Sequence, residues 1–72
     1  MITYDFMIAT VTEGYFKDRN VAVLSEENNI CTCEISDSEE DVLIPKSSLR
    51  FWRSAQSVTV KDGVLQEVVW SN

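Results

Sequence analysis

Hydrophobic residues alternate with polar ones over much of the chain, the pattern of β-strands that bury one face. The first such stretch, Ile2–Thr12, has hydrophobic residues on both faces near its middle. It is long for a strand, which predicts a bend near Ala9 or Thr10. Shorter hydrophobic runs predict a second strand over Val21–Leu24 and a third over Ile30–Ile35.

The middle of the chain continues this pattern. Glu13-Gly14 and the polar residues 25–29 predict turns that separate the first three strands. Val42–Ile44 predicts a fourth strand, and Pro45 ends it or restricts it to a sheet edge because proline has no N–H to donate. Lys46–Leu49 then predicts a single helical turn.

The C-terminal third contains the clearest hairpin. Ser57–Lys61 and Val64–Trp70 flank Asp62-Gly63, a pair favoured in the two-residue turns of β-hairpins. Strict alternation in the last strand places Val64, Gln66, Val68 and Trp70 on one face and Leu65, Glu67 and Val69 on the other. The chain is therefore predicted to be all-β: a small curled antiparallel sheet, or a partly open SH3-like barrel, of five to six strands with at most one short helical turn.

Composition limits the size and setting of this fold. The 72 residues are expected to form one small domain, 1–72, whose hydrophobic fraction of 44% is ordinary for a globular chain. A chain of this size buries only roughly 60% of the surface it exposes when unfolded, so its stability is marginal. The start of the sequence lacks the basic and hydrophobic regions of a signal peptide, and no run is long enough for a membrane helix. A cytoplasmic location is expected.

Catalytic chemistry has little support in the sequence. There is no histidine, which removes Ser-His and Cys-His relays and the commonest metal ligand. Cys31 and Cys33 point to one face of a strand about 6.6 Å apart, too far for an unstrained disulfide. Two cysteines are also too few for a structural zinc site, unless a dimer assembles four sulfurs across a two-fold axis. We therefore expect a non-enzyme with no metal or cofactor, whose cysteines stay reduced in the core.

Negative charge is concentrated in the middle of the chain. The net charge is −6, from 12 acids and 6 bases, and residues 26–41 contain seven acids and no base. If the second to fourth strands are neighbours, these acids gather at one end and edge of the sheet. Six of them form a candidate partner-binding acidic face: Glu26, Glu27, Asp37, Glu39, Glu40 and Asp41. The same charges would also serve solubility or protect a sheet edge from aggregation.

A second candidate surface is the segment Arg50-Phe51-Trp52-Arg53, because tryptophan and arginine are common in binding hot spots. In an extended segment Phe51 and Arg53 face one way, and Arg50 and Trp52 the other, so one aromatic ring is buried and one lies nearer the surface. Alternatively both rings close the barrel and the arginines cover them. A third arrangement is an aromatic cage for a methylated cation formed with Tyr15 and Phe16.

The leading functional hypothesis is a non-enzymatic protein-binding regulator or inhibitor. Its acidic face would imitate a nucleic acid and engage a basic protein that handles nucleic acid, as small phage or mobile-element proteins do. Direct binding to nucleic acid or to membranes is not expected, since both require a basic surface. The alternative is a structural subunit, a small β-barrel that forms homo-oligomers through an edge strand, with Val64–Trp70 as the candidate edge.

Overall fold

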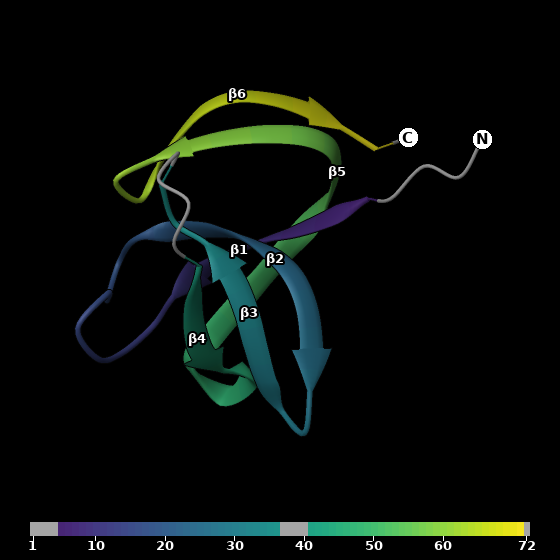
Figure 1. Cartoon of the computed structure of the whole chain (residues 1–72). Coiled ribbons are helices and arrows are strands. Elements are labelled where there is room, and N and C mark those ends of the chain that lie inside the picture. The colour runs from purple at the N-terminus through teal and green to yellow at the C-terminus, as the bar shows by residue number, and fades with distance from the viewer. Residues whose placement is uncertain (1–4, 37–40, 72) are drawn as a thin grey trace.

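Six antiparallel strands form one sheet in the computed structural model, which describes residues 5–36 and 41–71. The order across the sheet is β4-β3-β2-β1-β5-β6, so β4 and β6 are its edges. The strands are β1 (Phe6–Val11), β2 (Asn20–Glu27), β3 (Ile30–Glu34), β4 (Val42–Pro45), β5 (Leu49–Lys61) and β6 (Val64–Trp70), with one 3-10 turn, η1 (Lys46–Ser48). The all-β prediction is confirmed, and the sheet is curled but not closed into a barrel (Figure 1). Among the described residues, no helix has the length and hydrophobicity needed to cross a bilayer.

Two tight hairpin turns connect neighbouring strands. Asn28 and Asn29 have φ values of 53° and 65°, and Asp62 and Gly63 have values of 51° and 77°. Positive φ at both central positions is typical of the type I′ turn, whose twist matches that of the flanking strands. Asparagine, aspartate and glycine tolerate this conformation best, which explains the placement of both hairpins.

The curl of the sheet arises where the pairing of strands shifts register. Ile8 is opposite Arg53 and Ala9 is opposite Phe51, so Trp52 is an extra residue in β5, a β-bulge. Further shifts occur between Val23 and Ser25 in β2 and within the β5–β6 pair. Bulges bend and twist a strand, and the 13-residue β5 curves so that its second half lies with β6 across β1 and β2 (Figure 1).

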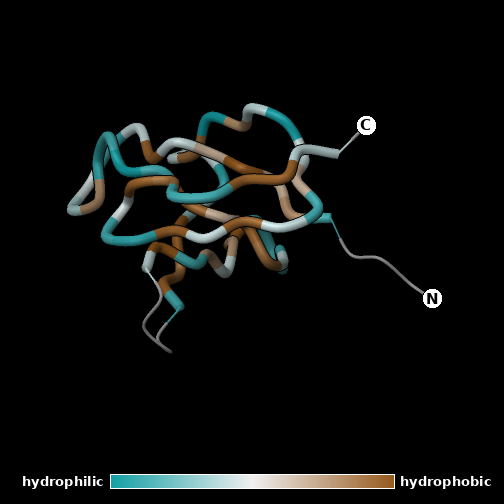
Figure 2. Tube along the Cα trace, turned by 90° about the horizontal axis from the view of Figure 1, so that it is seen from above, coloured by the Kyte–Doolittle hydropathy of each residue, from teal (hydrophilic) through white to brown (hydrophobic). Residues whose placement is uncertain are grey.

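This folding back covers both faces of the central strand. Ile8 belongs to a cluster beneath the β5–β6 hairpin that also contains Ala22, Ala55 and Val60. Its neighbour Ala9 points to the opposite face, into a larger cluster formed mainly with β2, β3 and β4. Both residues are fully buried, as the hydrophobic residues on both faces of this segment predicted. Figure 2 shows the hydrophobic stretches running mostly through the strands and the hydrophilic stretches mostly at the turns.

The tip of the C-terminal hairpin is fixed to the rest of the sheet through Gly63. Asn20 N–H donates to Gly63 O at 2.9 Å, and Gly63 N–H donates to Ile35 O at 2.8 Å. The Arg19 side chain lies directly over Gly63 and forms a 2.6 Å ion pair with Asp62. The hairpin therefore closes over the sheet instead of standing free.

Candidate functional site

The described acids of the predicted acidic face lie at two places along the β2–β3–β4 edge. Glu26 and Glu27 are at the end of β2, beside the β2–β3 turn, and Glu26 forms a 3.1 Å ion pair with Lys46. Asp41 directly precedes β4 at the opposite end of β3. Asp37, Glu39 and Glu40 lie outside the described residues.

The register gives the separation of these groups. Glu26 is opposite Cys31, while Val42, the neighbour of Asp41, is opposite Cys33. The two places are therefore about three residues, or ~10 Å, apart along the sheet. The expectation that the acids gather at one end of the sheet is wrong for Glu26, Glu27 and Asp41, because the length of β3 separates the segments that carry them. Because β3 also separates β2 from β4 across the sheet, the charges are further apart than one screening length in physiological salt, roughly 8 Å.

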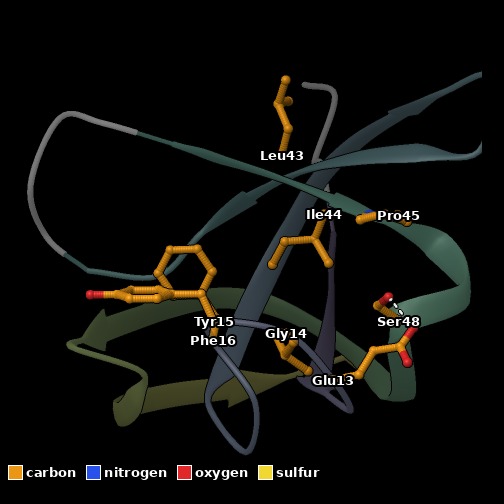
Figure 3. Close-up of a pocket in the computed structure, with 9 residues that line it drawn as sticks. Glu13, Gly14, Tyr15, Phe16, Leu43, Ile44, Pro45 and Ser48 are labelled. Carbon is orange, nitrogen blue, oxygen red and sulfur yellow. Dashed lines mark hydrogen bonds between the residues drawn. The ribbon is translucent and has the colours of Figure 1, made fainter.

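A groove of about 470 Å3 lies between β4 and the loop that follows β1. We call it the β4 groove and define it by Val11, Glu13, Tyr15, Phe16, Ile44 and Ser48. Figure 3 shows the Ile44 side chain pointing into it between the two aromatic rings at one end and Glu13 with Ser48 at the other. A cavity of this size is within the range of ordinary ligand sites, and its lining is mostly hydrophobic.

The aromatic end of the groove is set by a compact turn after Gly14. Gly14 has a φ of 88°, and its carbonyl accepts a 3.2 Å hydrogen bond from Lys17 N–H. The rings of Tyr15 and Phe16 meet edge to face with centroids 4.9 Å apart. Phe16 packs against the core, whereas Tyr15 is 90% exposed. An exposed ring held by a partly buried one is a surface feature that a partner can contact.

The polar end of the groove joins the loop to η1. Ser48 Oγ donates a 2.9 Å hydrogen bond to Glu13 Oε1, and Thr12 N–H donates to Ser48 O at 2.8 Å. Within the part of the chain that the structure describes, no hydrogen bond or ion pair uses the second carboxylate oxygen of Glu13. Sequence reasoning did not select Glu13 as a site residue. In the sequence, Glu13 is only an acid next to a glycine and two aromatics, because its hydrogen-bond partner Ser48 is 35 residues away.

The predicted aromatic and basic segment lies on β5, away from this groove. Phe51 is half-buried and packs against the larger core cluster, while Trp52 is 48% exposed. As the extended segment predicted, one ring packs on the core and the other lies nearer the surface. The predicted alternation of Trp52 and Arg53 is wrong, because the bulge at Trp52 lets both side chains reach Trp70.

Trp52 is held in a defined position. Its ring stacks on Trp70 with a centroid distance of 6.4 Å and an angle of 19° between the planes. The Arg53 guanidinium carbon is 4.9 Å from the Trp70 ring centroid, within cation–π range. Arg50 is exposed on the same strand. Tyr15 and Phe16 line the groove and Trp52 stacks on Trp70, so the structure places the three aromatics of the proposed cage at two separate surfaces.

Both cysteines are buried free thiols in the core, as predicted. Burial, with smaller contributions from the neighbouring Cys31 and Asp41, raises the pKa of the Cys33 thiol to about 12. Burial also raises the pKa of Cys31, with a smaller contribution from Glu26. A protonated, buried thiol is a poor nucleophile and a poor metal ligand. Within residues 5–36 and 41–71, no three acidic, cysteine or histidine side chains are grouped closely enough to hold a metal ion.

Comparison with protein families, curated proteins and solved structures gives no match for this chain.

Proposed function

We propose that this chain is a non-enzymatic protein-binding regulator whose β4 groove takes a basic, partly hydrophobic segment of another protein. The observation that carries the proposal is the groove itself: a hydrophobic floor with the 90% exposed ring of Tyr15 at one end and the Glu13 carboxylate at the other. Leu43, on the adjoining edge strand, is 70% exposed. Exposed hydrophobic residues rimmed by charge are typical of protein interaction sites.

Charge determines the kind of partner. The net charge is −6, and two of the six bases, Arg19 and Lys46, already pair with Asp62 and Glu26. Such a molecule attracts a basic surface over several ångströms and accelerates association with it. Proteins that bind nucleic acid carry such surfaces. The partner class we propose is therefore a component of nucleic-acid-handling machinery, and this chain would block it as a small inhibitor of phage or mobile-element type.

The chemistry of the buried thiols supports a binding role over a catalytic one. Cysteine is the most nucleophilic type of side chain in the chain. Both cysteines, Cys31 and Cys33, are fully buried, and the pKa values of their thiols are raised. Neither faces the β4 groove. The groove itself offers one carboxylate, that of Glu13, and the hydroxyls of Ser48 and Tyr15. The Glu13 carboxylate and the Ser48 hydroxyl bond to each other.

A second candidate, assembly of identical copies, is favoured by one observation. β6 is an edge strand, and Val64 and Val69 on it are exposed. Sedimentation velocity over a hundredfold concentration range tests this role. A dimer or closed ring that the Val69→Lys variant disrupts would support assembly, and a monomer at every concentration would contradict it.

The test of the regulator role is selection from a displayed library of random nine-residue peptides on the immobilised protein. Parallel selections use Tyr15→Ala, Glu13→Gln and, as a control on the far edge, Glu67→Gln. We expect the wild type and the Glu67 variant to enrich basic peptides that contain a hydrophobic residue, and Tyr15→Ala to lose the enrichment. Glu13→Gln keeps an acceptor for Ser48 and should lose only the preference for basic residues. Enrichment of acidic peptides, or identical selections on all four proteins, would contradict the proposal.

A further inference from the structure

We infer that the partner segment binds as an additional β-strand on the free edge of β4, an inference that rests on the proposed function of the groove. Among residues 5–36 and 41–71, β4 ends the sheet order, so only one of its edges is paired, with β3. The groove is lined by Leu43, Ile44 and Pro45 together with the loop after β1, and by no residue of β3. It therefore opens beside the unpaired edge of β4.

The pairing of β4 with β3 shows which backbone groups face this edge. Ile30 is opposite Pro45, and Lys46 N–H, one residue further along, donates to Asn29 O at 2.9 Å. Backbone groups of successive residues in a strand point to alternate edges. Lys46 and Ile44 therefore face β3, and Leu43 faces away from it.

Proline fits this assignment. Pro45 lies at a position whose nitrogen points away from β3, so its missing N–H costs no hydrogen bond in the sheet. The unpaired edge consequently presents the N–H and C=O of Leu43, whereas Pro45 is the N-cap of η1 and its C=O accepts the first hydrogen bond of that turn. Among the described residues, no backbone hydrogen bond of a turn, loop or cap uses either group of Leu43. The N–H and C=O of Leu43 are the donor and acceptor pair that an added strand requires.

An added strand would place its side chains in a defined way. The partner residue opposite Leu43 lies on the same face as the Leu43 side chain, which points away from the groove in Figure 3. Its two neighbours share the face of Ile44 and enter the groove about 6.6 Å apart. One reaches the rings of Tyr15 and Phe16, and the other reaches Glu13. The partner motif is therefore a hydrophobic and a basic residue two positions apart.

The opposite edge of the sheet, β6, is less suited to the addition of a strand. β6 carries the charged Glu67 near its middle, and the register of its pairing with β5 shifts at Gln66. Charged side chains and bulges on an edge strand discourage the addition of further strands. β4 is only four residues long and ends at Pro45, but it carries no charged residue and no bulge, and no groove residue comes from β6.

The experiment separates the backbone of Leu43 from its side chain. Leu43→Pro removes the outward N–H without removing a bond to β3, whereas Leu43→Ala keeps the N–H and removes most of the side chain. The probe is a capped, threonine-rich heptapeptide with a leucine and an arginine two positions apart, together with a version in which their order is reversed. Affinity is measured by NMR titration, whose spectra also report whether each variant is folded. The exchange rate of the Leu43 amide, with and without peptide, provides a second measurement on the wild type.

We expect Leu43→Pro to weaken the better of the two peptides roughly three- to tenfold, the loss of one hydrogen bond, and Leu43→Ala to weaken it by less. The bound peptide should slow exchange of the Leu43 amide at least tenfold while leaving the Thr59 amide unchanged. Equal affinities for the two variants and unchanged exchange at Leu43 would overturn strand addition. If the peptide still shifts Tyr15 and Ile44 in that case, groove binding stands. If it shifts neither, the proposed function fails as well.

Discussion

Trp52 Nε1 donates a 2.7 Å hydrogen bond to Oγ1 of Thr10, a residue 42 positions earlier in the chain. Thr10 Oγ1 in turn donates to Asn20 Oδ1 at 2.8 Å, which links β5, β1 and β2 through their side chains. Together with the stack on Trp70, this hydroxyl fixes a half-exposed indole at the bulge of β5. The position of Trp52 is therefore set by the fold and not by contact with a partner.

Replacing this hydroxyl should lower stability. Thr10→Val has a similar shape and removes both hydrogen bonds, so we expect it to lose about 1–2 kcal/mol of unfolding free energy. Thr10→Ser retains the hydroxyl and should lose less. Urea denaturation followed by tryptophan fluorescence measures both variants. Equal stability of the two would show that the hydrogen bonds contribute nothing.

Gly63 and Gly14 offer a matched pair of glycine substitutions. Both have positive φ, 77° and 88°, so alanine at either position costs about 1 kcal/mol or more in backbone strain. A Cβ at Gly63 would also lie 2.7–2.8 Å from three carbons of the Arg19 side chain, whereas at Gly14 it would meet nothing within 4 Å. We expect Gly63→Ala to be the more destabilising by thermal denaturation, and Arg19→Ala to recover part of the difference. A greater loss at Gly14 would contradict this account of the hairpin tip.

The thiol of Cys33 should make stability fall at alkaline pH. Its pKa in the folded protein is raised from 9.0 to about 12, so the unfolded chain releases this proton at a lower pH than the folded protein does. The stabilisation is complete below pH 9 and is lost as pH rises toward 12, by about 1.4 kcal/mol per pH unit within that window. The Cys33→Ala variant should show a shallower decline between pH 9 and 10.5 in urea denaturation. Identical slopes would contradict a buried, protonated thiol.

Charge reversal tests the acidic face of the leading hypothesis. Lysine at Glu39, Glu40 and Asp41 together should weaken binding of basic peptides selected on the wild type and reduce its dependence on salt. The matched control is Glu67→Lys, because Glu67 lies on the opposite edge strand. Titrations at 50 and 300 mM salt measure both effects. Affinity unchanged across this range in the wild type would exclude an electrostatic role for the acids.

The turns of this fold could be read from the sequence because each depends on a few local residues. Asp62-Gly63 was predicted as a hairpin turn and has the φ values of one. The polar loop predicted over residues 25–29 is shorter in the structure, because β2 runs to Glu27 and only Asn28 and Asn29 form the turn. The position of this turn was indicated by the two asparagines, which tolerate positive φ.

The bulges could not be read in the same way, since a bulge is defined by the partner strand. The predicted strand Ser57–Lys61 is the second half of β5, which begins at Leu49. The extra residue at Trp52 interrupts the alternation that would have revealed its first half. In β6, the register shift at Gln66 brings Leu65 to the same core cluster as Val68 and Trp70, which contradicts the strict alternation assumed for this strand.

The β4 groove was not predicted because its two walls are about thirty residues apart in the chain. Tyr15 and Phe16 were noted as aromatics and Pro45 as an edge residue, but only the curl of the sheet brings them together. The acids of residues 26–41 were predicted to form the binding surface instead, because a cluster of charge can be recognised from the sequence alone. Among the described acids of this stretch only Asp41 adjoins β4, and Glu13, which lines the groove, lies outside the stretch.

The central claim is that the β4 groove binds the partner segment. Chemical-shift mapping of the labelled protein with the heptapeptide probe tests it most directly, because the mapping distinguishes the β4 groove from the surface formed by Trp52 and Trp70. The account predicts saturable shifts at Gly14, Tyr15, Phe16, Leu43 and Ile44, and unchanged indole signals of Trp52 and Trp70. Shifts confined to the two tryptophans, or no saturable shift at the groove, would contradict it.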